Sequence, residues 1–205
     1  MKNDAILLTI GIVTYKRVDK LRVLLSSLLA QTRRDFLIYV IHDGVDFDTK
    51  VLIEHFTKLT NIPIIFEETD NRINDYGHSL REIIIGKATT EYLLLTNDDN
   101  YYAPIFVEEF LGEILDNGLD IAYCDMVHSH TFKESNIDAN YQVLITEPKR
   151  AKIDIGCFIV RSEIAKKVGF PDKSFDGDAT FFEMCLKSKK FTVIGKIKKV
   201  LFVHN

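Results

Sequence analysis

The sequence predicts an α/β fold with a mostly parallel central sheet flanked by helices. Along the first 120 residues, short runs rich in isoleucine, leucine and valine alternate with segments whose leucines recur at helical spacing. These runs are apolar at nearly every position, which is typical of strands buried on both faces. The 205 residues contain no repeat and no linker, so we expect one domain, 1–205, with a regular half at 1–120 and a less regular half at 121–205.

Strands and helices alternate in the first half. Strands are predicted at 5–14, 36–41, 62–66 and 92–95. The first helix follows Asp19, an N-cap candidate, and the second opens at Asp48 or Thr49. Two further helices are predicted at 76–88 and 105–116. The latter lies between Pro104, at a first helical position, and the stop signal Gly118. This alternation indicates a parallel sheet with helices on both faces.

The second half is less periodic. Strands are predicted at 121–127 and 155–160, and one or two more within 191–203 close the chain. Helices are predicted at 162–168 and 178–189, where the terminal lysines suit the helix dipole. The polar stretch 128–153 gives no periodic signal, and we expect it to be irregular.

Composition excludes several classes of protein. With 26 basic and 30 acidic residues, the formal net charge of −4 excludes nucleic-acid binding through bulk charge. No apolar run could span a bilayer, and the N-terminus lacks a signal-peptide cleavage site. Three cysteines, Cys124, Cys157 and Cys185, without a CxxC pair favour reduced thiols and a cytoplasmic location. We also expect no room for a separate membrane or acceptor-binding domain, so that any tether is another chain.

Polar residues follow three of the predicted strands, at 14–17, 42–44 and 97–100. Because ligands of open parallel sheets bind outside the carboxyl ends of the strands, we expect these groups to converge. An aromatic ring, two cations and several carboxylates there indicate a phosphorylated ligand with a divalent metal. Taken singly, Asp43-Gly44 also fits a turn, and 97–100 fits a solvated loop that caps the next helix. Tyr15 and Arg17 also fit ordinary surface positions.

Several segments together resemble family 2 glycosyltransferases of the GT-A fold, over nearly the whole chain. Residues 8–17, LTIGIVTYKR, are similar to the family's first strand and turn. Residues 40–46, VIHDGVD, resemble its Asp-Asp-Gly-Ser segment, with His42 in place of the first aspartate. Residues 91–104, EYLLLTNDDNYYAP, resemble the strand with the Asp-X-Asp motif, with Asn97 at its first aspartate.

The resemblance continues in the second half. Residues 155–161 resemble the family's acceptor-side strand. Residues 169–170 and 175–178 resemble the run into the Glu-Asp catalytic motif, in which Gly177 replaces the first acid. Residues 200–204 resemble a terminal strand that delivers a histidine to the metal in some GT-A enzymes.

The resemblance implies roles for ten residues. Asp178 is the implied catalytic base, with Asp176 as the fallback; a helix cap alone is the other interpretation of Asp178. A divalent metal, Mn²⁺ or Mg²⁺, is implied with Asp99 and His204 as ligands. Tyr15 stacks on the base of the nucleotide, and Asp43 hydrogen-bonds the edge of that base. The full set implied for nucleotide-sugar binding is Thr14, Tyr15, Arg17, Asp43, Arg81, Asn97 and Asp98.

The implied reaction is an inverting, metal-assisted hexosyl transfer from a nucleotide-diphosphate sugar to a hydroxyl of a sugar, a lipid-linked or another acceptor. The setting would be bacterial-type polysaccharide, glycan or glycolipid synthesis. Residues 1–120 would bind the donor and 121–205 would carry the acceptor and catalytic groups. A homo-oligomer or a membrane-associated partner chain is compatible with this function. We interpret His128 and His130 as loop or acceptor-side residues, because two histidines without a third ligand are a weak zinc signal.

Two other functions stay open from the sequence. A sugar nucleotidyltransferase also builds a metal-phosphate site on such a sheet, but we would expect a glycine-rich basic loop after its first strand. Here that turn reads Thr14-Tyr15-Lys16-Arg17, without glycine. The other alternative is a catalytically weakened nucleotide-sugar-binding protein, for which the departures at Asn97 and Gly177 argue.

Overall fold

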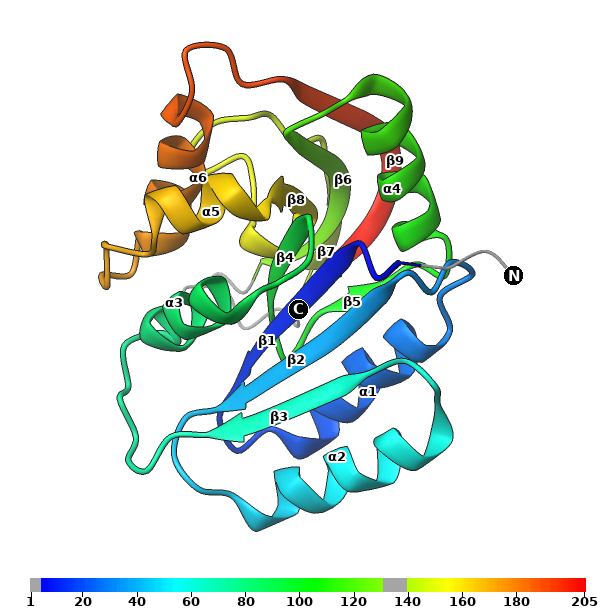
Figure 1. Cartoon of the computed structure of the whole chain (residues 1–205), viewed down its shortest axis with the longest axis vertical. Helices are drawn as coiled ribbons and strands as arrows, with labels where there is room; N and C mark the ends of the chain where they lie inside the picture. Colours follow the sequence, from blue (N-terminus) through cyan, green and yellow to red (C-terminus); the bar gives the residue numbers. More distant parts are fainter. Residues whose placement is uncertain (1–4, 131–139) are drawn as a thin grey trace.

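The computed structural model describes residues 5–130 and 140–205, and in these it contains a mixed nine-stranded sheet flanked by six α-helices (Figure 1). The strands are β1 Leu8–Thr14, β2 Phe36–His42, β3 Ile64–Glu68, β4 Tyr92–Asn97, β5 Tyr101–Tyr102, β6 Ile121–His130, β7 Asn140–Leu144, β8 Phe158–Arg161 and β9 Ile194–His204. The helices are α1 Val18–Leu29, α2 Phe47–Leu59, α3 His78–Lys87, α4 Phe106–Asn117, α5 Ser162–Val168 and α6 Gly177–Lys187, with a short 3₁₀ helix at Ile155–Cys157.

The sheet has the order β3-β2-β1-β4-β8-β6-β9-β5, and β7 pairs with β6 outside this path. The first four strands in this order are parallel. β8 runs antiparallel to both β4 and β6, and β9 returns parallel to β6. The predicted α/β class is confirmed, and antiparallel pairs are confined to the half of the sheet beyond β4.

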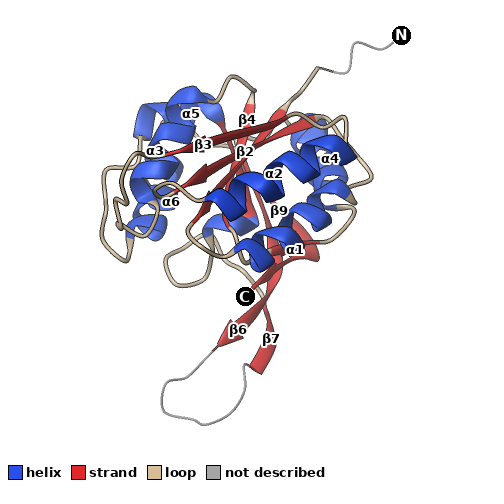
Figure 2. Cartoon of the chain, turned by 90° about the horizontal axis from the view of Figure 1, so that it is seen from below, coloured by secondary structure: helices blue, strands red, loops and turns tan. Residues whose placement is uncertain are grey.

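Each face of the sheet is covered by its own set of helices (Figure 2). Side chains alternate between the faces along each strand, so Ile10 and Ile12 of β1 pack toward α1, α2 and α4, whereas Val13 packs toward α3, α5 and α6. Burial on both faces explains why the strands are nearly continuous apolar runs. The two cores fix the carboxyl ends of β1, β2 and β4 side by side.

Several predicted boundaries in the first half are wrong, for local reasons. Asp19 is not the cap of α1; it lies in the first turn, and the N-cap residue is Arg17. The second helix opens neither at Asp48 nor at Thr49, because the Asp46 carboxylate accepts a hydrogen bond from Thr49 N at 2.9 Å and caps α2. Asp48 therefore lies in the first turn of that helix.

Polar residues extend two strands beyond their predicted ends. Thr96 and Asn97 continue β4 because they pair with Ile12 and Val13 of β1. In the second half, β6 reaches His130 because β7 pairs with it, so part of the stretch predicted as irregular is a strand pair. Residues 131–139 of that stretch and the terminal residues 1–4 lie outside the described residues.

The predicted strand at 155–160 begins as a 3₁₀ turn. The Asp154 carboxylate accepts from Gly156 N at 2.8 Å and caps this turn, so that β8 starts only at Phe158. The prediction for α5 is confirmed at both ends, and the Gly118 stop of α4 is confirmed by its left-handed backbone. The three cysteines are free and buried. Within the described ranges, no helix is long and apolar enough to cross a membrane.

Candidate functional site

A cleft of about 810 Å³ opens at the carboxyl ends of β1, β2 and β4. Its walls also include the start of α3, the start of α6 and the end of β9. A volume of this size suits a ligand of the size of a nucleotide. The fold brings all ten residues predicted for the site to this cleft: Thr14, Tyr15, Arg17, Asp43, Arg81, Asn97, Asp98, Asp99, Asp178 and His204.

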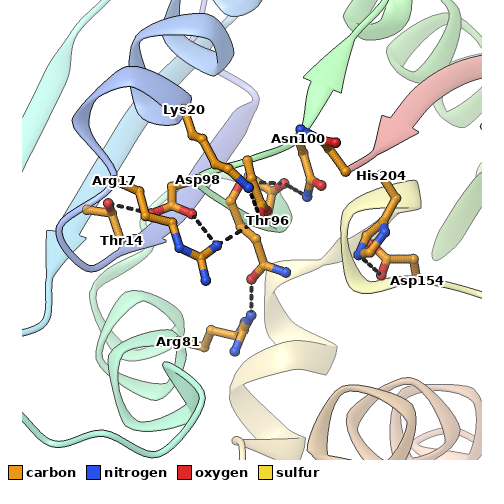
Figure 3. Close-up of polar contacts among 12 residues, drawn as sticks. Thr14, Arg17, Lys20, Arg81, Thr96, Asp98, Asn100, Asp154 and His204 are labelled. Carbon is orange, nitrogen blue, oxygen red and sulfur yellow. Dashed lines mark hydrogen bonds and ion pairs between the residues drawn. The ribbon is translucent and has the colours of Figure 1, made fainter. Parts of the chain in front are cut away.

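Two aspartates at the end of β4 face cations from the β1 side (Figure 3). Asp98 is buried and accepts a hydrogen bond from Thr14 Oγ1 at 2.7 Å. Burial raises the pKa of Asp98, although the Thr14 hydroxyl and Arg17 act in the opposite direction. The Asp99 carboxylate lies 2.8 Å from Arg17 Nη1 and 3.5 Å from Lys20 Nζ. This end of the cleft therefore has two carboxylates that pair with two half-exposed cations.

In the turn after β2, His42 replaces the aspartate of the family pattern and makes the hydrogen bonds that fix the turn. His42 is fully buried, its Nδ1 lies 2.7 Å from Gly44 O, and its Nε2 accepts from Lys16 N at 3.0 Å. These partners require a neutral ring that carries its proton on Nδ1. The neighbouring Asp43 carboxylate accepts from the backbone N–H groups of Ile73 and Asn74 at 2.6 and 2.9 Å.

Tyr15 forms one wall of the same region. The guanidinium carbon of Arg72 lies 3.8 Å from the centre of its ring, and the His42 ring lies 5.8 Å away. Arg72 also lines the cleft. Arg72 could not be predicted from the sequence, because it lies in the loop after β3 and no periodic signal points to it. Hydrogen bonds between that loop and His42, Asp43 and Gly44 hold it at the sheet edge.

Arg81 is a cation that is almost completely buried, with 1% of its surface exposed. Its Nη1 donates to Tyr76 O at 2.8 Å and to His78 Nδ1 at 2.9 Å, and its Nη2 donates to Asn97 Oδ1. His78 is also buried, and its Nε2 lies 2.8 Å from Ser174 O. Burial and the Arg81 charge lower the pKa of His78, which is consistent with a neutral ring that accepts at Nδ1.

Asp178 lies in the first turn of α6 beside this pair. Its Oδ1 is 3.6 Å from His78 Nδ1 and 3.7 Å from Arg81 Nη1, distances too long for hydrogen bonds. This oxygen is buried without a hydrogen-bond partner. Burial raises the pKa of Asp178, and the Arg81 charge opposes that rise. The interpretation of Asp178 as a helix cap is wrong, because the N-cap residue is Asp176 and no side chain caps this helix.

Gly177 has a steric reason to be glycine. A Cβ at this position would lie 2.5 Å from Asp172 O and 2.7 Å from His78 Nε2. The sequence could not reveal this constraint, because His78 is 99 positions away along the chain. The departure from the family's first acid therefore accompanies a histidine packed against the turn that precedes Asp178.

The end of β9 brings His204 to the cleft. His204 Nε2 lies 3.5 Å from Asp154 Oδ2 (Figure 3), and its ring stacks on the ring of His128 with centroids 4.4 Å apart. His128 lies on β6 and lines the cleft, so the loop alternative for this residue is wrong, whereas its acceptor-side role stays a prediction. The side chain of His130 lies outside the described part of the chain. Asp154 was not predicted, since it reaches His204 through the packing of the 3₁₀ helix that it caps against β9.

A metal would need ligands beyond those of the protein. Among the described side chains, no group of three or more His, Cys, Asp or Glu could hold an ion. Asp99 and His204 nevertheless line one cleft, and His204 Nδ1 is buried without a hydrogen-bond partner. A carboxylate and an unpaired ring nitrogen fit a divalent ion whose remaining ligands are phosphate oxygens.

Comparison with known proteins gives a family and a fold. The profile of "Glycosyl transferase family 2" matches residues 9–164. No curated protein matches the sequence.

Among solved structures, S. aureus TarS 1-349 in complex with UDP is 16% identical with a TM-score of 0.76, and the match covers 97% of this chain and 60% of that one. The mannosyltransferase PcManGT from Pyrobaculum calidifontis, in complex with GDP-Man and Mn²⁺, is 13% identical with a TM-score of 0.68. That match covers 96% of this chain and 56% of PcManGT. The chain thus spans about 60% of the length of the TarS 1-349 structure.

The packing around Gly177 predicts opposite effects for two glycine substitutions. Gly177→Ala forces its new methyl group against Asp172 O and the His78 ring, and we expect it to lower the free energy of unfolding by about 1–3 kcal/mol. Gly112→Ala, in α4, meets no atom within 4 Å and is expected to raise it by about 0.5–1 kcal/mol. Urea unfolding measures the free energy of unfolding of both variants. A Gly177→Ala variant as stable as the wild type would contradict the steric constraint.

Proposed function

The chain belongs to glycosyl transferase family 2, and on this basis we propose that it transfers a hexosyl unit from a nucleotide-diphosphate sugar to an acceptor hydroxyl with inversion. One observation carries the proposal: Asp178 has a buried carboxylate oxygen without a hydrogen-bond partner, in the same cleft as the nucleotide-binding set. The side chain as a whole is 33% exposed, so the carboxylate stays accessible to a substrate hydroxyl and is suited to accept its proton.

The donor would occupy the β1, β2 and β4 side of the cleft. Tyr15 would stack on the base, and Asp43 would accept a hydrogen bond from its edge while still holding the loop at Ile73 and Asn74. Asp98, already bonded to Thr14, and the Asn97 amide would bind the ribose. Arg17 and Lys20 are about half exposed and pair with Asp99, so they are available to contact the diphosphate.

A divalent metal, Mn²⁺ or Mg²⁺, would be held by Asp99 and His204, with the diphosphate supplying the other ligands. His204 suits this role because the carboxylate of Asp154 near Nε2 favours a proton there, which leaves Nδ1 with a lone pair. When bound, the ion supplies charge neutralisation for the leaving diphosphate. Asp99 would exchange its contacts with Arg17 and Lys20 for this ion.

In the proposed step, Asp178 takes the proton of the acceptor hydroxyl while that oxygen attacks the anomeric carbon. The bond from that carbon to the diphosphate oxygen breaks, and the nucleoside diphosphate leaves with the electron pair. Attack opposite the leaving group inverts the anomeric configuration. Burial makes Asp178 a stronger base, and the Arg81 charge favours its ionised form.

Two alternatives are less well supported. The family favours glycosyl over nucleotidyl transfer. A binding protein without catalysis was suggested by Asn97 and Gly177. However, Asn97 accepts a hydrogen bond from Arg81, and Gly177 is the residue that leaves room for His78. Both departures therefore fit a working arrangement. Polysaccharide, glycan or glycolipid synthesis remains the proposed setting, with residues 1–120 as the donor half and 121–205 as the acceptor and catalytic half.

Donor binding can be measured without an acceptor. A thermal-shift panel of UDP-GlcNAc, GDP-Man and their free diphosphates, each with Mn²⁺ or with excess EDTA, is expected to reveal at least one stabilising nucleotide. At about 100 times its Kd, a ligand stabilises a fold by about 2.7 kcal/mol, or about 5–10 °C for a chain of this size. We expect EDTA to reduce the shift. Equal shifts in EDTA would contradict the metal role of Asp99, and no shift with any nucleotide sugar would contradict the donor proposal.

The variant Asp178→Asn tests the proposed role of Asp178 as the catalytic base. Transfer or slow donor hydrolysis is expected to fall about a hundredfold or more, while the nucleotide thermal shift stays unchanged. Because burial raises the pKa of Asp178 in the folded state, ionisation lowers stability as pH rises through the ordinary value of 3.8 and then the raised one. The asparagine variant should therefore be at least as stable at pH 7.

Asp176→Asn is the matched control for this substitution, since Asp176 is an aspartate two residues away with 68% of its side chain exposed. Its Oδ2 lies 3.6 Å from Arg150 Nη1 in an exposed ion pair, which contributes little to stability. We therefore expect Asp176→Asn to retain most of the transfer activity. If Asp178→Asn transfers normally, or if only Asp176→Asn loses transfer activity, Asp178 is not the catalytic base.

A further inference from the structure

Two exposed aromatic rings flank the Asp178 end of the cleft. Tyr76 is 64% exposed and Phe175 is 79% exposed, and both line the cleft. Their centroids are 5.9 Å apart, and the rings meet edge to face at 80°. They come from different loops, one directly before α3 and the other directly before α6. Neither ring therefore belongs to the hydrophobic core, yet both are brought to one place.

The backbone under Tyr76 is strained. Tyr76 has φ 60°, in the left-handed region that bulky residues rarely adopt, and Gly77 follows with φ 79°. The Tyr76 carbonyl accepts a hydrogen bond from buried Arg81, which fixes this conformation. Because the Tyr76 ring is largely exposed, it contributes little to the stability of the fold that would offset this backbone strain. Strain of this kind is characteristic of ligand-binding segments.

The surroundings of the two rings are polar. Asn74, His78 and Asp178 line the cleft beside them. The cations Lys173 and Arg150 are already engaged, Lys173 by Glu82 and Arg150 by Asp176 and Glu183. An apolar surface bordered by hydrogen-bonding groups matches a ligand with one apolar face and hydroxyl groups around it. Because none of these neighbours is a free cation, the ligand is expected to be neutral. A pyranose ring has this chemistry.

We propose that Tyr76 and Phe175 form an L-shaped platform, in which one ring takes the apolar face of a neutral pyranose acceptor and the other borders that sugar, so that a hydroxyl is directed at Asp178. This inference rests on the proposed glycosyl transfer and narrows its acceptor to a sugar ring. The base of the donor has a separate aromatic partner, Tyr15, on the β1 side of the cleft, where Arg72 covers one ring face. Stacking the C–H face of a sugar on aromatic rings removes apolar surface from water without breaking the hydrogen bonds of its hydroxyls.

Saturation-transfer NMR on the whole chain with UDP and Mn²⁺ tests the platform. The probes are methyl β-D-glucopyranoside and methyl β-D-galactopyranoside, with sorbitol as an acyclic polyol. We expect saturation of the pyranosides, strongest at the protons of one ring face, and little saturation of sorbitol. Phe175→Ala and Tyr76→Gly should each reduce the pyranoside signal about fivefold or more. Glycine at 76 also relieves the φ strain, so this variant is expected to fold.

Phe191→Ala is the matched control, because Phe191 is 77% exposed and does not line the cleft. It should leave the pyranoside signal unchanged, and Tyr76→Phe should retain it. An undiminished signal in Phe175→Ala and Tyr76→Gly, or equal saturation of sorbitol, overturns the platform. A protein that binds UDP but no pyranoside also overturns it and leaves the proposed donor chemistry standing. If the wild type shows no thermal shift with any nucleotide sugar of the panel, the donor proposal is overturned instead.

Discussion

The buried guanidinium of Arg81 is the constraint on which the site depends. Moving an arginine out of water costs several kcal/mol unless its donors find acceptors. Nε is buried without a partner, but Nη1 and Nη2 donate to the Tyr76 carbonyl, the His78 ring and the Asn97 amide. These acceptors come from the loop before α3, from α3 itself and from the end of β4. The nearest carboxylate, Asp178, lies 3.7 Å away on α6. One cation therefore links the donor side of the cleft to the proposed base.

This arrangement gives a physical meaning to both departures from the family pattern. An aspartate at position 97 would pair with Arg81 and weaken its effect on Asp178, whereas the neutral Asn97 accepts the hydrogen bond and leaves the charge available. Neutral His78 likewise accepts from Arg81 without adding charge. Its ring fills the space that a side chain at position 177 would need. The two substitutions belong to one electrostatic and steric design.

Sequence patterns were sufficient where burial dictates composition. Strands buried on both faces, and helices with one apolar stripe, indicate the fold class and the alternation of strands and helices along the first half of the chain. Elements whose existence depends on distant pairing were missed: β5 exists because Tyr101 and Tyr102 pair with β9, and β7 because it pairs with β6. The same distinction holds in the site. Residues at strand ends could be predicted, whereas His78, Asp154 and Arg72 act through neighbours that only the folded chain supplies.

The most direct test of this account is the pKa of Asp178, measured by ¹³C NMR of its carboxyl carbon in the wild type, Arg81→Lys and Arg81→Met. Burial raises the pKa of Asp178 and the Arg81 charge lowers it. Removal of the charge in Arg81→Met should therefore raise this pKa further, with a smaller rise in Arg81→Lys. The acid limb of the pH–rate profile should move in parallel. An Asp178 pKa that is the same in all three folded proteins would contradict the coupling between the donor side and the base.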